Sequence, residues 1–242
     1  MDSSIPELKA VQQPVIVSRK LLLWMGIISI FAAVGCVAAD LILQYDPQGN
    51  YSLTTPAPLT IALWRVFVGS FLGVFCIPLE IAGYWVVCTL LTATSPRLFR
   101  VLFWIISYGI VIGTVFHGSV LALILVEQAG HNAIGITQAT LFHLQSTLLI
   151  FILPLGFFFE ICYFILWGIV VVTILRNKTH YPKWFVLFVP VLGSLVITGI
   201  SQSHIIPVLG NILYPTVLSL PHLCFFTVST LYFRKNWVTK IR

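Results

Sequence analysis

The chain has 242 residues, of which 59% are hydrophobic and 8% are charged, and its formal net charge is +6. A soluble domain has roughly 25% charged residues, so this chain cannot cover its apolar side chains with a charged surface, and a water-soluble fold is excluded. The mean hydropathy of +1.02 is that of a protein embedded in lipid.

Six long apolar segments, separated by short polar breaks, predict an all-α transmembrane bundle of six helices. Each segment approaches or exceeds the roughly 20 residues that cross a ~30 Å hydrocarbon core as a helix. The predicted spans are residues 21–44, 59–92, 101–126, 140–175, 184–203 and 207–233, within a transmembrane domain 21–233 flanked by tails 1–20 and 234–242. The alternating pattern of barrel strands is absent from the sequence.

The second and fourth segments are longer than one crossing requires, and each contains a proline, Pro78 and Pro154. A proline lacks the amide hydrogen and crowds the preceding turn, so both helices are predicted to be kinked. Two interpretations stay open for them. Each is either a tilted helix that protrudes from the membrane, or a discontinuous helix whose free backbone groups face a ligand.

The basic residues predict the orientation of the chain. All but one of the 13 Lys and Arg residues precede the first span, lie between spans two and three or four and five, or belong to the C-terminal tail. In a six-span chain these segments share one side, which the positive-inside rule places in the cytoplasm together with both termini. Orientation and anionic lipid then explain the positive charge without a nucleic-acid partner.

The remaining basic residue, Arg65, falls inside the second span near its outer end, where it needs a partner or water. Asp40, near the outer end of the first span, is the nearest acidic residue in the topology, and a structural ion pair between the two is the first hypothesis. Two alternatives stay open, in which Arg65 reaches outward to the lipid headgroups or anchors an anionic ligand.

Four further polar residues complete a candidate cavity with Arg65. Glu80 and Glu160 lie in the inner halves of the two long segments, and without basic partners they are expected to be neutral. They either hydrogen-bond a neighbouring helix or serve as proton-accepting or ligand-binding carboxyls. His117 in the third span and His222 in the sixth are either neutral packing residues or ligand-binding groups.

No sequence pattern identifies a reaction. Metal-binding H-E-x-x-H, P-loop, dinucleotide-binding and G-x-S-x-G patterns are all absent from the sequence. The five cysteines fall in apolar runs without C-x-x-C spacing and are interpreted as core residues. We therefore expect neither a metal nor a cofactor. Asn50 begins a glycosylation sequon in the first outer loop, and the sequence does not decide its use.

Several short motifs in the chain resemble an uncharacterised family of bacterial six-span membrane proteins. They are Trp64-Arg65, Gly69, Gly73, Pro78, Gly83-Tyr84-Trp85, His117-Gly118, Tyr181-Pro182-Lys183-Trp184, Pro207 and Asn211. The resemblance covers nearly the whole chain and implies the six-span architecture and a bacterial inner membrane. It implies no activity and carries no catalytic residues.

The sequence thus favours a multi-pass membrane protein that binds a small amphiphilic or lipid-like molecule among membrane lipids. The candidate cavity residues are Arg65, Glu80, His117, Glu160 and His222. Three other classes stay open: a proton-coupled transporter, an intramembrane enzyme acting on a lipid or isoprenoid, and a subunit of a homo-oligomer or larger membrane complex.

Overall fold

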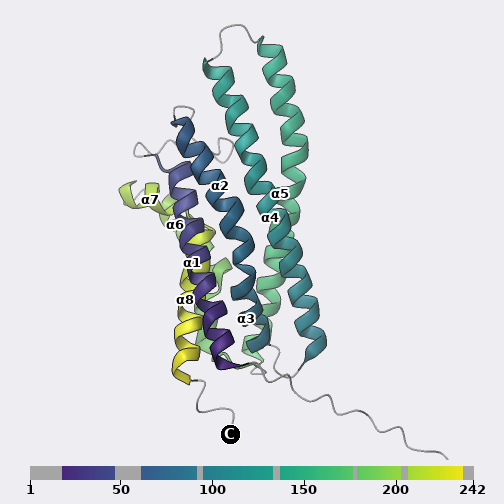
Figure 1. Cartoon of the computed structure of the whole chain (residues 1–242), viewed down its shortest axis with the longest axis vertical. Coiled ribbons are helices and arrows are strands. Elements are labelled where there is room, and N and C mark those ends of the chain that lie inside the picture. Colours follow the sequence, from purple (N-terminus) through teal and green to yellow (C-terminus); the bar gives the residue numbers. More distant parts are fainter. Residues whose placement is uncertain are drawn as a thin grey trace, which may run out of the picture.

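A computed structural model of the chain describes residues 18–46, 61–91, 95–132, 137–176, 179–202 and 207–236. Every regular element within these residues is a helix, so the predicted all-α class is confirmed. Figure 1 shows an elongated bundle whose long helices run side by side along its length.

The helices occur in the following order along the chain. They are α1 (Arg19–Gln44), α2 (Leu63–Leu79), α3 (Ile81–Leu91), α4 (Pro96–Asn132), α5 (Gln138–Leu175), the 3₁₀ helix η1 (Lys183–Phe188), α6 (Pro190–Gln202), α7 (Pro207–Leu213) and α8 (Ser219–Asn236). Ser18 and Thr137 cap two of the long helices, because each side chain accepts a hydrogen bond from the backbone three residues later, at 3.2 Å in both cases.

Four helical segments are long and apolar enough to cross a membrane: Arg19–Gln44, Leu63–Leu91, Pro96–Gly130 and Gln138–Leu175. They correspond to the first four predicted spans. The last two predicted spans are assembled from shorter pieces, η1 with α6 and α7 with α8. The structure therefore supports a membrane protein, and the count of six spans stays a proposal.

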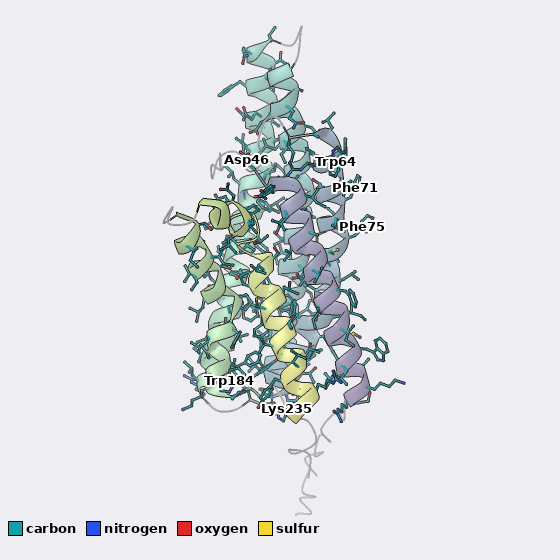
Figure 2. All side chains as sticks on the ribbon, turned by 90° about the vertical axis from the view of Figure 1, so that its left-hand side faces the viewer. Asp46, Trp64, Phe71, Phe75, Trp184 and Lys235 are labelled. Atoms are coloured by element: carbon teal, nitrogen blue, oxygen red, sulfur yellow. The ribbon has the colours of Figure 1, made fainter. Side chains whose placement is uncertain are left out.

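The outer faces of the long helices are apolar, as contact with lipid requires. Phe31, Phe75 and Trp104 are each at least 70% exposed. Figure 2 shows Trp64, Phe71 and Phe75 projecting away from the bundle. In water such a surface would aggregate, whereas in a bilayer it is matched to the solvent.

The second predicted span is interrupted where its proline lies. Glu80 separates α2 from α3, and its N–H donates to the carbonyl of Ile77 at 3.1 Å, which tightens the last turn of α2. Pro78, two residues earlier, has no amide hydrogen to continue the α-helical pattern. In contrast, α5 continues through Pro154 without an interruption.

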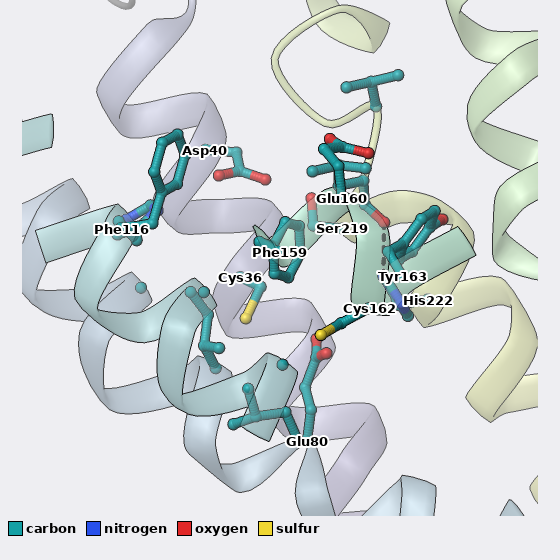
Figure 3. Close-up of a pocket in the computed structure, with 18 of the residues that line it drawn as sticks. Cys36, Asp40, Glu80, Phe116, Phe159, Glu160, Cys162, Tyr163, Ser219 and His222 are labelled. Atoms are coloured by element: carbon teal, nitrogen blue, oxygen red, sulfur yellow. Dashed lines mark hydrogen bonds between the residues drawn. The ribbon is translucent and has the colours of Figure 1, made fainter. Parts of the chain in front are cut away.

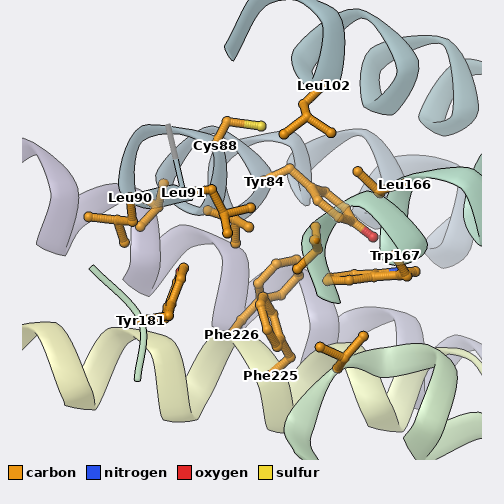
Figure 4. Close-up of a cluster of buried hydrophobic side chains, with 14 of the residues drawn as sticks. Tyr84, Cys88, Leu90, Leu91, Leu102, Leu166, Trp167, Tyr181, Phe225 and Phe226 are labelled. Carbon is orange, nitrogen blue, oxygen red and sulfur yellow. The ribbon is translucent and has the colours of Figure 1, made fainter. Parts of the chain in front are cut away.

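The end of the bundle where Arg19 and Arg234 lie, which we call the basic end, is filled by a large cluster of buried side chains, the aromatic core (Figure 4). Its large members include Tyr84, Trp167, Phe185, Phe225 and Phe226. The rings of Trp167 and Phe225 pack edge to face with centroids 5.0 Å apart. The core joins α1, α3, α4, α5, η1 and α8, so that end of the bundle is closed.

The first and last helices meet at this closed end. The Arg19 Nη2 atom donates to the main-chain carbonyl of Arg234 at 2.8 Å, near the end of α8. A cation there also interacts favourably with the negative end of the helix dipole. The start of α1 and the end of α8 therefore lie on the same side of the bundle.

The opposite half of the bundle is less filled. A smaller cluster, Leu43, Ile61, Val66, Val120 and Ile124, joins only the segments around α1, α2 and α4. Figure 1 shows α4 and α5 extending beyond the other helices at this end. The larger of the two buried clusters thus lies in the basic half.

Close contact between α1, α3 and α8 depends on Gly83. A Cβ atom at this position would lie 2.5 Å from the Cβ of Ser29 and 2.7 Å from the Phe226 ring. Gly168 in α5 offers a contrast, since nothing lies within 4 Å of a Cβ built there.

Gly83→Ala is expected to destabilise the protein by about 1–3 kcal/mol, because the added methyl group overpacks a three-helix contact. The matched Gly168→Ala variant should be neutral or slightly stabilising, because its methyl group meets open space and alanine is the better helix former. Thermal unfolding of both variants in the same nanodisc measures the difference. Equal midpoints for Gly83→Ala and the wild type would contradict the close packing.

Candidate functional site

A cavity of about 430 Å³ lies beyond the aromatic core, toward the less filled half. Its lining comes from α1 to α6, from residues 214–218 and from the first turn of α8. Figure 3 shows carboxyl groups entering it from different helices. The lining is mostly apolar by area, and polar side chains from several helices reach it.

Four of the five predicted cavity residues line this space: Glu80, His117, Glu160 and His222. Arg65 does not. Asp40, which the sequence suggested as the partner of Arg65, lines the cavity instead. Where the structure places these side chains determines which of the open roles each one can have.

The predicted ion pair between Asp40 and Arg65 is not formed in the structure. The Arg65 Nε atom donates to the carbonyl of Ile42 at 2.8 Å, and Nη2 donates to the carbonyls of Tyr45 at 2.8 Å and Leu41 at 3.4 Å. These carbonyls belong to the end of α1, where the helix leaves acceptors without intrahelical partners and where its dipole favours a cation. Arg65 therefore caps α1.

His222 has both ring nitrogens bonded. Its Nδ1 lies 2.8 Å from the carbonyl of Leu218, and its Nε2 lies 2.6 Å from the Tyr84 hydroxyl. A carbonyl can only accept, so Nδ1 carries the hydrogen, and in a neutral ring Nε2 then accepts from the tyrosine. His222 is thus a buried link between α3 and α8, with no nitrogen left for a ligand.

His117 is held more loosely than His222. Its Nε2 lies 3.5 Å from the carbonyl of Gly69, which is at the outer limit of a hydrogen bond. The ring also packs against Gly73, where any Cβ atom would collide with it. Small residues on α2 therefore make room for this imidazole, and the ring remains available to the cavity.

Three carboxyl groups reach the cavity: Asp40 from α1, Glu80 from the α2–α3 junction and Glu160 from α5. Glu80 is 7% exposed and lies beside the Cys36 thiol. Glu160 is exposed, so it marks the open rim of the cavity. In the part of the chain that the structure describes, no three His, Cys, Asp or Glu side chains are placed to hold a metal ion.

The sequence analysis did not identify Ser219, the residue at the start of α8. It is 6% exposed and lies beside the Asp40 carboxyl, but its Oγ makes no hydrogen bond of good geometry with the described protein atoms, and it lines the cavity beside Glu160 in Figure 3. An unbonded buried hydroxyl costs stability, so it marks a place where a ligand or water can bond. Its spacing of three residues before His222 was the available signal, because that spacing places both on one helix face.

The apolar helices and the cavity define a helical membrane protein with a partly open space inside its bundle. The model of a family of unknown function, DUF6796, matches residues 17–236, so the chain belongs to that family. The predicted membership of an uncharacterised family is thereby confirmed. Comparisons with curated proteins and with solved structures find no match.

Arg65→Met is expected to destabilise the protein by about 1.5–3 kcal/mol, because it removes charge-assisted hydrogen bonds to the end of α1. Asp40→Asn should change stability independently, since the two side chains do not pair, and the double variant should show the sum of the two effects. Unfolding midpoints of the four proteins form the test. Recovery of stability in the double variant would restore the ion-pair hypothesis.

Proposed function

We propose that the protein spans the bacterial inner membrane six times, with both termini in the cytoplasm, and binds a small amphiphilic or lipid-like molecule in its cavity. The observation that carries the second part is the convergence of polar side chains from α1, α4, α5 and α8 on one mostly apolar space. A ligand with a polar end and an apolar body matches such a lining.

One contact and the placement of the basic residues support an even number of spans. The hydrogen bond from Arg19 to the Arg234 carbonyl brings the start of α1 and the end of α8 to the same end of the bundle. The other described basic residues at helix ends, Arg97, Arg176 and Lys183, also belong to elements that begin or end at the aromatic core. A single basic face is what the positive-inside rule expects on the cytoplasmic side.

Reporter fusions test this topology. Fusions after residues 49 and 130 should report the outer compartment, whereas fusions after residues 95, 177 and 242 should report the cytoplasm, because the chain crosses the membrane between them. A cytoplasmic signal from either outer position would contradict six spans.

The size and opening of the cavity support the proposed ligand. Its volume of about 430 Å³ lies within the range of small-molecule sites. The aromatic core closes it toward the basic end, while Glu160 at its rim is exposed on the surface of the bundle. An amphiphile can therefore enter without passing through the packed core.

Blocking the cavity tests the binding directly. Ile110 lines the cavity, whereas the next residue, Val111, is 59% exposed on the outer face of α4. Ile110→Trp should fill part of the space, and Val111→Trp is the matched control. The probes are 1-octanol, octylammonium and octanoate, which share one tail and differ in the charge of the head.

At least one probe should raise the unfolding midpoint of the wild type and of Val111→Trp in nanodiscs, and should have little effect on Ile110→Trp. A concentration tenfold above the dissociation constant stabilises the folded state by about 1.4 kcal/mol, which corresponds to a shift of several degrees. The proposal is wrong if no probe stabilises the wild type, or if Ile110→Trp responds as the control does.

A further inference from the structure

We propose that the ligand is a cation. Its head group is a protonated amine, which the carboxyl groups of the cavity bind. This inference rests on the proposed function and adds the chemical class of the ligand head. It is carried by the charges of the side chains that line the space and by the buried Ser219 hydroxyl, which has no hydrogen bond of good geometry there.

Among its described lining residues, the cavity contains carboxyl groups and no side chain with a permanent positive charge. Asp40, Glu80 and Glu160 line it from three different elements, and no Lys or Arg is among the lining residues that the structure describes. Carboxylates in a low-dielectric space need a cation nearby or must become neutral. A ligand cation would supply that partner.

The basic residues that the structure describes do not serve this role. Arg65, the cation closest in sequence to the cavity lining of α2, gives its hydrogen bonds to the end of α1. Other described basic residues, such as Arg19 and Lys183, lie on elements that enter the aromatic core. An anionic head would therefore meet three carboxyl groups and no opposing charge, so the structure disfavours an anionic ligand.

Ser219 provides an independent indication of a ligand. Its Oγ is buried beside the Asp40 carboxyl without a hydrogen bond of good geometry, and it lines the same space as the carboxyl groups (Figure 3). A protonated amine has several N–H donors, and serine and carboxylate oxygens can accept them together. The rings of Phe116, Phe159 and Tyr163 also line the cavity, and aromatic faces attract cations.

The test compares the three eight-carbon probes in nanodiscs of zwitterionic lipid. Octylammonium should bind the wild type at least tenfold more tightly than 1-octanol, and octanoate should bind most weakly. Binding is measured from the dependence of the unfolding midpoint on probe concentration. Because the tails are identical, the comparison isolates the charge of the head.

Carboxamide variants then locate the charge effect. Asp40→Asn and Glu80→Gln should each reduce the preference for octylammonium over 1-octanol by about tenfold, because each removes a negative charge from the cavity. Glu160→Gln is a third variant. Because Glu160 is exposed at the rim, this substitution does not disturb buried packing. Glu127→Gln is the matched control, since Glu127 bonds Gln145 and does not line the cavity.

Each result separates this inference from the proposed function. Equal binding of the three probes, lost in Ile110→Trp, would overturn the charge preference and leave amphiphile binding intact. A preference for octylammonium that Glu127→Gln reduces as much as the cavity variants would also overturn it, because the charge would then act from outside the cavity. Absence of binding by every probe would overturn both proposals.

Discussion

The hydrogen bond between Tyr84 and His222 marks the level at which the bundle changes from packed to hollow. It joins α3 to α8 over 2.6 Å, and the Leu218 carbonyl holds the other ring nitrogen at 2.8 Å. With both nitrogens bonded, the imidazole can lie among aromatic rings without a desolvation penalty for unpaired polar atoms. On one side of this link Trp167 and its neighbours fill the space between helices. On the other side the helices carry small and acidic residues, so the cavity stays open.

Two reciprocal ring-on-glycine contacts keep α4 and α5 together beside the cavity. A Cβ atom at Gly113 of α4 would lie 2.9 Å from the Phe159 ring of α5, and one at Gly156 of α5 would lie 3.0 Å from the Phe116 ring of α4. Each ring therefore occupies the place of a missing side chain on the opposite helix. Both rings also line the cavity, so the contact that joins the two longest helices also forms part of the apolar wall.

The positions of the carboxyl residues within the predicted spans were enough to predict part of the site. Glu80 and Glu160 had to avoid lipid, and the structure brings both to one cavity. The partner of Arg65 was predicted wrongly, because counting charged side chains overlooks the main-chain acceptors at the end of a helix. Asp40 lies four residues after the buried Cys36, so the two share one face of α1, and both line the cavity. The 3₁₀ helix before α6 is apolar like an α-helical span, so hydropathy could not reveal the form of the fifth predicted span.

The account depends on an open space inside the bundle, and the most direct measurement is a density map of the protein purified in nanodiscs with lipids from its own membrane. Elongated density is expected in the cavity, against Phe159, with one end near Asp40 and Ser219. The same map would contradict the account if the side chains of α4 and α5 closed over the space, or if lipid density were confined to the outer faces of the helices.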